Sequence, residues 1–177
     1  MELWFTEMHN ENSKSSMKIK KHIYSIESPF QKIDVLDSFE YGKVLVIDGF
    51  VMLTEKDEYI YHEMIVHVPL AVNPNIRDIL VIGAGDGGTL RELIRYNSIK
   101  NIDFVEIDEK VVEVSKKYLP FVSKGFNDNR INFYYEDGVK FIADKENLYD
   151  LIIVDSTDPI GPGEGLFTIE FYNNCYK

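Results

Sequence analysis

The sequence has little cysteine and no long apolar run. Its only cysteine, Cys175, cannot form a disulfide within the chain, so the composition favours a reducing compartment and predicts a cytoplasmic protein. The longest apolar stretch, residues 65–72, is interrupted by His67 and Pro69, and it is far shorter than the roughly 20 residues of a membrane-spanning helix. Residues 1–7 contain no basic region followed by an apolar one, so neither a secretory signal nor a membrane protein is expected.

The chain is also poor in positive charge. Its 177 residues include 19 Lys and Arg against 30 Asp and Glu, which gives a formal net charge of −11. Such a field repels phosphate backbones, so nucleic acid is not an expected partner. The field attracts cationic ligands, although the same charge is compatible with a role in solubility alone.

Residues 1–55 are predicted to form a small antiparallel β domain. Polar and apolar residues alternate there with the period of half-buried strands, and Asp48-Gly49 is typical of a hairpin turn. The polar segment 10–16 is expected to be a loop. The expected strands are 18–26, 30–36 and 44–53.

Residues 56–177 are predicted to form a Rossmann-like domain that lacks its later strands. Helical spacing begins at about Glu58 and ends near Pro74, and short apolar strands then alternate with amphipathic helices. This alternation is typical of an α/β fold with a doubly wound parallel sheet. The expected strands are 79–82, 101–105, 131–135 and 151–154, and the expected helices are 89–96, 109–118, 139–144 and one that begins at Phe167.

A glycine-rich loop, Gly83–Gly88, joins the first of these strands to a helix in the pattern G-x-G-x-x-G. Glu106 ends the next strand, where a carboxylate would bind ribose hydroxyls. The loop alone does not separate dinucleotides from S-adenosyl compounds. Asp86 would repel a pyrophosphate at the helix N-terminus and attract a sulfonium or an ammonium, unless it only caps the helix. Asp137-Gly138, after the third strand, would bind an adenine amine or form a capping turn.

A second acidic pair, Asp155 and Asp158, follows the fourth strand. Ligands of open α/β sheets bind at the carboxyl ends of the strands, so Asp155 is expected in the same crevice as Asp86. An ordinary Asx turn is the alternative. If a sulfonium makes a neighbouring carbon electrophilic and an amine attacks it, Asp155 would accept the amine proton. Asp158 would hold the amine in line.

From Trp4 to Lys177 the chain resembles spermidine synthases, a family of putrescine aminopropyltransferases, and five separate motifs in the same order carry the resemblance. They are Ser28-Pro29-Phe30-Gln31, Asp57-Glu58-Tyr59-Ile60-Tyr61-His62-Glu63-Met64, Gly83-Ala84-Gly85-Asp86-Gly87-Gly88, Val105-Glu106-Ile107-Asp108 and Asp155-Ser156-Thr157-Asp158-Pro159-Ile160-Gly161-Pro162.

The resemblance implies transfer of an aminopropyl group from decarboxylated S-adenosylmethionine to putrescine, with spermidine and 5′-methylthioadenosine as products. It implies no metal and no prosthetic group, and assembly into a homodimer or homotetramer. It also implies roles for single residues. Asp155 would be the proton acceptor; Asp86, Tyr61, His62 and Asp158 would bind the amines; Gln31, Glu106, Asp137, Gly138 and Pro162 would bind the nucleoside.

Several alternatives remain open at the level of sequence. The acceptor of an aminopropyltransferase could instead be spermidine, agmatine or cadaverine. The chain could be an S-adenosylmethionine-dependent methyltransferase, or an inactive fragment that binds polyamines, because members of the resembled family continue beyond the position of Lys177. His62 by itself could be a partly exposed packing residue. His62 and His67 do not share one helix face, which argues against a zinc helix.

Overall fold

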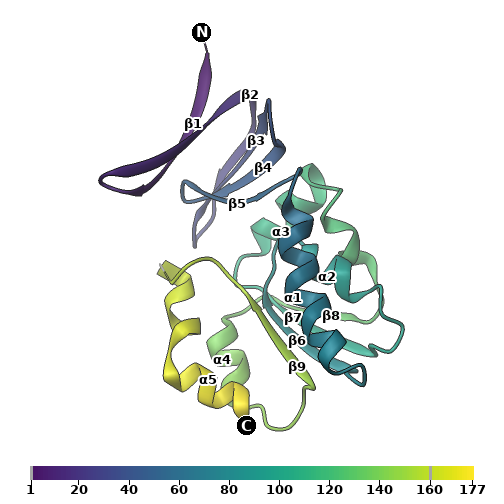
Figure 1. Ribbon diagram of the computed structural model, residues 1–177. Coiled ribbons are helices and arrows are strands. Elements are labelled where there is room, and N and C mark those ends of the chain that lie inside the picture. Colours follow the sequence, from purple (N-terminus) through teal and green to yellow (C-terminus); the bar gives the residue numbers. More distant parts are fainter. Residues whose placement is uncertain (1, 160) are drawn as a thin grey trace. The chain divides into compact units, whose positions relative to one another are not determined.

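The computed structural model describes residues 2–159 and 161–177 (Figure 1). The chain divides into two compact units, with the division between Tyr61 and His62. Within the described residues, no helix has both the length and the apolar character needed to cross a membrane.

The N-terminal unit is a five-stranded antiparallel sheet in sequential order. One apolar cluster of this unit consists of Ile19, Leu36, Val44 and Val46. The predicted hairpin at Asp48-Gly49 is confirmed, because both residues have positive φ, 50° and 86°, between two paired strands. The strands are β1 (Leu3–Asn10), β2 (Ser13–Glu27), β3 (Lys32–Ser38), β4 (Gly42–Ile47) and β5 (Phe50–Thr54).

The predicted loop over residues 10–16 is wrong. The chain turns only at Glu11 and Asn12, and β2 begins at Ser13. Residues of β1 pair with this polar stretch, as in the Thr6 Oγ1 to Ser16 Oγ contact of 2.8 Å. Most side chains on both faces of this part of the hairpin are exposed, so no apolar alternation marks the strands in the sequence.

The C-terminal unit contains a four-stranded parallel sheet in the order β8-β7-β6-β9, which confirms the predicted fold class. The strands are β6 (Asp78–Gly83), β7 (Asn101–Val105), β8 (Ile131–Tyr134) and β9 (Leu151–Asp155). The helices are α1 (Glu58–Val72), whose first turns belong to the N-terminal unit, α2 (Gly88–Leu93), α3 (Glu109–Tyr118), α4 (Gly138–Ala143) and α5 (Ile169–Tyr176), with 3₁₀ helices at Ser123–Asn127 and Gly161–Phe167.

The last helix begins later than predicted. Gly161–Phe167 forms the 3₁₀ helix, and Thr168 then caps α5 by accepting a hydrogen bond from Phe171 N at its Oγ1. A hydroxyl at the N-cap replaces one missing backbone partner of the first turn, and so fixes the start of the helix at Ile169.

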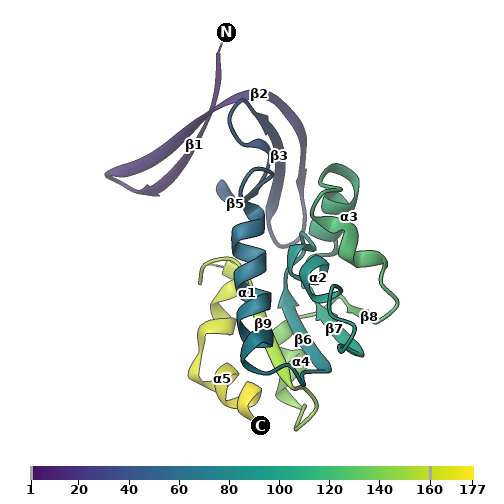
Figure 2. The ribbon, with the colours of Figure 1, turned by 45° about the vertical axis from the view of Figure 1, so that its right-hand side comes forward.

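Successive side chains of β6 point to opposite faces of the sheet and enter two separate cores. Ile79 and Val81 pack in the cluster that includes residues of α1, α2 and α3, whereas Leu80 and Ile82 pack in the cluster of α4 and α5. Figure 2 shows α1 in front of the strands of this sheet and α4 behind them. Helices therefore cover both faces, as in other parallel sheets. The carboxyl ends of all four strands meet at one edge, which places Asp155 and the segments after Gly83 and Val105 there.

Candidate active site

The glycine-rich loop is fastened to the end of β9. Ala84 N donates a hydrogen bond of 2.7 Å to the main-chain oxygen of Asp155, and Gly83 pairs with Asp155 in the sheet. Gly83 has φ +83°, and a Cβ there would lie 2.0 Å from that same oxygen. No other residue type fits this position, because a side chain would separate the loop from Asp155.

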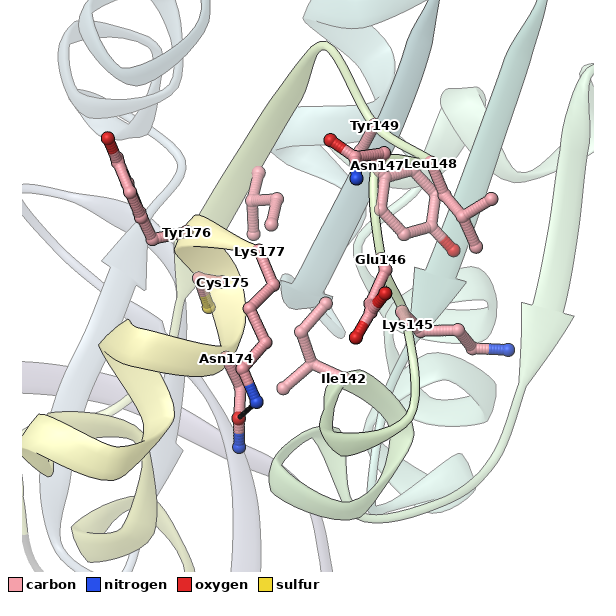
Figure 3. A pocket seen from close by; sticks show the side chains of 11 residues that line it. Ile142, Lys145, Glu146, Asn147, Leu148, Tyr149, Asn174, Cys175, Tyr176 and Lys177 are labelled. Carbon is pink, nitrogen blue, oxygen red and sulfur yellow. Dashed lines mark hydrogen bonds between the residues drawn. The ribbon is translucent and has the colours of Figure 1, made fainter.

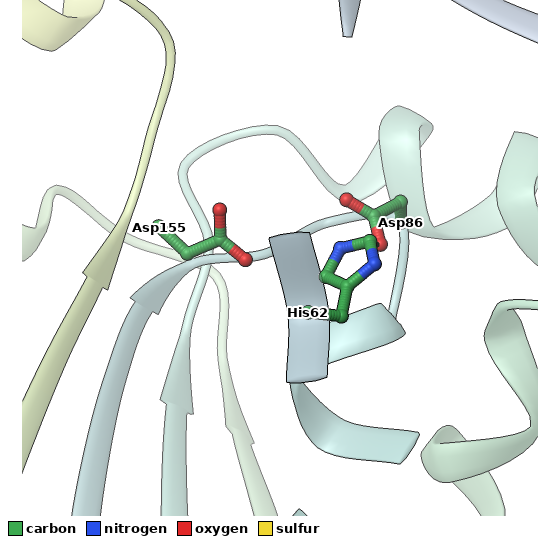
Figure 4. Close-up of side chains that lie close together, drawn as sticks. All are labelled: His62, Asp86 and Asp155. Atoms are coloured by element: carbon green, nitrogen blue, oxygen red, sulfur yellow. Dashed lines mark ion pairs between the residues drawn. The ribbon is translucent and has the colours of Figure 1, made fainter. Parts of the chain in front are cut away.

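Three polar side chains of the C-terminal unit converge at this edge: His62 from α1, Asp86 from the glycine loop and Asp155 from β9 (Figure 4). Their candidate ligand atoms all lie within 4.8 Å of one another. Asp86 Oδ1 accepts a hydrogen bond of 2.7 Å from Gly88 N and lies 3.2 Å from His62 Nε2. A cluster of two carboxylates and one imidazole can bind a cation, either an ammonium group or a metal ion.

His62 is a buried residue, 2% exposed, so the alternative of a partly exposed packing residue is wrong. Its ring lies directly against the backbone of α2. A Cβ at Gly88 would be only 2.3 Å from His62 Cε1. The absence of a side chain at Gly88 is what allows the imidazole to reach Asp86.

Replacing Gly88 by Ala is expected to displace the His62 ring, because the added methyl group would overpack the core around it. The free energy of unfolding should fall by about 1–3 kcal/mol. Urea unfolding measures this loss. In a His62→Ala background the same Gly88→Ala change should cost much less, since the ring is gone. An equal cost in both backgrounds would contradict this explanation of Gly88.

Glu106 follows β7 and is 7% exposed. Its Oε1 accepts a hydrogen bond of 2.9 Å from Asp108 N, and its Oε2 faces Gly85 of the glycine loop. Burial raises the pKa of Glu106 to about 7, and the nearby charges of Asp108 and Asp86 contribute in the same direction. A buried carboxyl group with such a pKa, at the edge where ligands of α/β sheets bind, marks a candidate binding group.

Asp137 caps α4, because its Oδ1 accepts a hydrogen bond of 2.9 Å from Val139 N. The capping turn weighed from the sequence is therefore present. Gly138 follows as the first residue of α4 and packs against Ile82 of β6. Both residues follow β8, and they therefore stand at the carboxyl edge of the sheet, as Asp155 does at the end of β9.

The structure does not bring Asp158 into the group formed by His62, Asp86 and Asp155. Asp158 is exposed on the turn after β9, and Pro162 is exposed in the following 3₁₀ helix. Ile160, which belongs to the same motif, lies outside the described residues.

Gln31 and Tyr61 belong to the N-terminal unit. Gln31 closes the turn between β2 and β3. Its backbone N donates a hydrogen bond of 3.0 Å to Ser28 Oγ, and its main-chain oxygen accepts one of 2.9 Å from Ser28 N. Tyr61 lies in α1 directly before His62 and is 51% exposed.

Thr89, which follows the glycine loop and is fully buried, was not predicted from the sequence as a site residue. Thr89 Oγ1 donates a hydrogen bond of 2.6 Å to Asp155 Oδ2. A hydroxyl in the first turn of the helix after a glycine loop was the available signal, but its partner lies 66 positions away in the sequence.

A second cluster, Glu63, His67 and Glu92, also brings candidate ligand atoms within 4.8 Å of one another. His67 Nε2 lies 3.1 Å from Glu92 Oε2, but Arg91 and Arg95 also pair with this carboxylate. Although burial acts in the opposite direction, the two guanidinium groups lower the pKa of Glu92. The positive charge that Glu92 requires is thus supplied by the protein itself.

A hollow of different character lies between the segment before β9 and α5 (Figure 3). Its lining residues include Lys145, Asn147, Tyr149, Cys175 and Lys177. It stands at the amino end of β9, whereas Asp155 stands at the carboxyl end. This hollow is therefore separate from the group around Asp86.

Comparison with known protein families gives two matches that together span nearly the whole chain. Residues 58–177 match the spermine/spermidine synthase domain, and residues 3–55 match the spermidine synthase tetramerisation domain.

Curated relatives include the polyamine aminopropyltransferases of Clostridium botulinum (strain Eklund 17B / Type B), 64% identical, and Alkaliphilus metalliredigens, 61% identical. Each alignment covers 100% of this chain and 62% of the relative. The chain therefore spans less than two thirds of the length of these relatives.

Solved structures agree. A spermidine synthase in complex with the transition state analogue AdoDATO is 43% identical, with a TM-score of 0.95 over 98% of this chain and 60% of that one. The spermidine synthase from Thermotoga maritima is 40% identical, with a TM-score of 0.91 over 98% of this chain and 58% of that one. On this evidence, the chain belongs to the spermine/spermidine synthase family.

Proposed function

We propose that this chain is the greater part of an aminopropyltransferase that moves the aminopropyl group of decarboxylated S-adenosylmethionine to putrescine, giving spermidine and 5′-methylthioadenosine. The observation that carries the proposal is the convergence of Asp86, Asp155 and His62 at the carboxyl edge of the sheet. Membership of the spermine/spermidine synthase family supports it over a methyltransferase.

The reaction requires the carbon beside a sulfonium to meet a neutral amine nitrogen. The C–N bond forms as the C–S bond breaks, and the electron pair of that bond stays on sulfur, which becomes a neutral thioether. The nitrogen becomes positively charged and loses a proton. Asp155 is the acceptor of this proton in our proposal, because a carboxylate at that position can take it as the new ammonium grows acidic.

Asp86 binds the amine of the aminopropyl group. Its carboxylate is oriented by Gly88 N and by His62, so it offers fixed negative charge to an ammonium without a further conformational change. His62, Tyr61 and Asp158 contribute to binding of the acceptor amine.

The nucleoside binds at the neighbouring strand ends. Glu106 accepts hydrogen bonds from the ribose hydroxyls, aided by Gln31, while Asp137, Gly138 and Pro162 surround the adenine. The buried carboxyl of Glu106 at the end of β7 supports this role. None of these steps calls for a metal ion or a prosthetic group.

We also propose that residues 1–55 act as an assembly domain and residues 56–177 as the nucleoside-binding catalytic domain. The match of residues 3–55 to a tetramerisation domain supports a homodimer or homotetramer. A cytoplasmic location fits the single cysteine. Spermidine, agmatine and cadaverine are the alternative acceptors.

The test is production of 5′-methylthioadenosine by the complete protein from decarboxylated S-adenosylmethionine, with putrescine and each alternative acceptor in separate reactions. Formation of methylthioadenosine and spermidine with putrescine is the expected result. Absence of methylthioadenosine with every acceptor would refute the function, and preference for another amine would correct only the acceptor.

Asp86 is expected to select the decarboxylated co-substrate, because intact S-adenosylmethionine carries a carboxylate beside the same amine. We expect the wild-type protein to bind the decarboxylated form at least about tenfold more tightly, a difference of about 1.4 kcal/mol. Asp86→Asn should reduce that preference. Calorimetric titration with both compounds measures it, and equal affinities in the wild-type protein would remove the selective role of Asp86.

A further inference from the structure

Asp155 is held at two points, one on its main chain and one on its carboxylate. Its main-chain oxygen accepts from Ala84 N at 2.7 Å, and its Oδ2 accepts from Thr89 Oγ1 at 2.6 Å. The second distance is typical of a hydroxyl donating to a charged carboxylate, a stronger interaction than a hydrogen bond between neutral groups. The main chain and the side chain of Asp155 are thus both fastened to the segment formed by the glycine loop and α2.

Thr89 is well suited to fix a direction. It is fully buried in the first turn of α2, and its branched side chain has few rotamers available in a helix. Its hydroxyl contact with Asp155 restricts rotation of the carboxylate about its own axis. Oδ1 of Asp155 therefore keeps one orientation relative to Asp86 and His62, whose polar atoms lie within 4.8 Å of the Asp155 carboxylate.

From this geometry we infer that Thr89 is a positioning residue for the proton acceptor: its hydroxyl occupies Oδ2 of Asp155 and aims Oδ1 at the amine that attacks. This inference deepens the proposed function and rests on it. A fixed acceptor matters because the N–H bonds of the attacking nitrogen point away from the carbon under attack, so the acceptor has to lie on that side. A displacement of about 1 Å can cost about 100-fold in rate. Thr89 itself touches neither substrate in this scheme.

Two substitutions of Thr89 separate positioning from packing. Thr89→Val keeps the branched shape but removes the donor, whereas Thr89→Ser keeps the donor and removes a methyl group. In the complete protein, Thr89→Val should lower kcat by about 10- to 100-fold and leave the KM of both substrates within about twofold. Thr89→Ser should stay close to the wild-type kcat although it loses more packing.

The inference is overturned if Thr89→Val retains the wild-type kcat, or if Thr89→Ser loses as much as Thr89→Val. A wild-type protein that makes no methylthioadenosine would refute the proposed function instead. In that case crystal structures of the two variants decide the inference: a rotated Asp155 carboxylate in Thr89→Val but not in Thr89→Ser supports it, and an unmoved carboxylate in both overturns it.

Discussion

Asp155→Asn is expected to lower the kcat of the complete protein by about 1000-fold, the middle of the range for loss of a general base. An amide cannot accept the proton that the attacking nitrogen releases. The variant should otherwise keep its structure, because the main-chain oxygen still accepts from Ala84 N and an amide oxygen can still accept from Thr89. Methylthioadenosine formation measures kcat, and calorimetric titration should give a nucleoside affinity close to that of the wild-type protein.

Asp144→Asn is the matched control, because it makes the same chemical change at an exposed carboxylate just after α4. Its kcat should equal that of the wild-type protein. If Asp155→Asn kept a kcat within about tenfold of the wild-type value, the loss would be smaller than removal of a general base produces. Asp155 would then have to be removed from the mechanism.

Glu106→Gln is expected to stabilise the fold at alkaline pH while it weakens nucleoside binding. The folded-state pKa of Glu106, about 7, lies above the ordinary value of 4.5. Between these two values the unfolded chain has lost a proton that the folded chain keeps, so stability falls as pH rises through this window. Above pH 7 the free energy of unfolding is lower by about 3 kcal/mol than at acid pH. A neutral glutamine at this position does not ionise, so the variant does not lose this stability.

Urea unfolding of this chain at several pH values between about 4.5 and 8 tests this expectation. The difference between Glu106→Gln and the wild-type protein should be small at the acid end and should approach about 3 kcal/mol at pH 8. Glu136→Gln, at an exposed carboxylate after β8, should show no such difference. A difference that does not change with pH would contradict the raised pKa.

The same Glu106→Gln variant should bind the nucleoside about 10- to 100-fold more weakly, because hydrogen bonds to a charged acceptor are replaced by bonds to a neutral one. Calorimetric titration with methylthioadenosine measures this change. Greater stability together with weaker binding would show that the buried carboxylate is retained for the ligand at the expense of the fold.

The fold could be predicted where burial leaves a periodic pattern. Ile79 to Ile82 are all buried because both faces of β6 are covered, and such an apolar run identifies a central parallel strand. The first hairpin was missed because both of its faces are exposed, as at Trp4, which is 56% exposed. Its register depends on backbone pairing, which has no periodic signature in side chains.

The site could be predicted only as far as topology determines it. Parallel strands end at one edge of a sheet, so the proximity of Asp86 and Asp155 follows from their positions at the ends of β6 and β9. The approach of His62 to Asp86 depends on how α1 packs over Gly88, and the contact of Thr89 with Asp155 joins residues far apart in sequence. Both contacts depend on tertiary packing, and no local sequence pattern predicts them.

A crystal structure of the complete protein with decarboxylated S-adenosylmethionine tests most directly whether the group formed by His62, Asp86 and Asp155 is an amine-binding site. We predict that the aminopropyl nitrogen lies within about 3 Å of an Asp86 oxygen, with the carbon beside the sulfonium turned toward Asp155. If the aminopropyl group pointed away from both carboxylates, neither aspartate could have the role proposed for it.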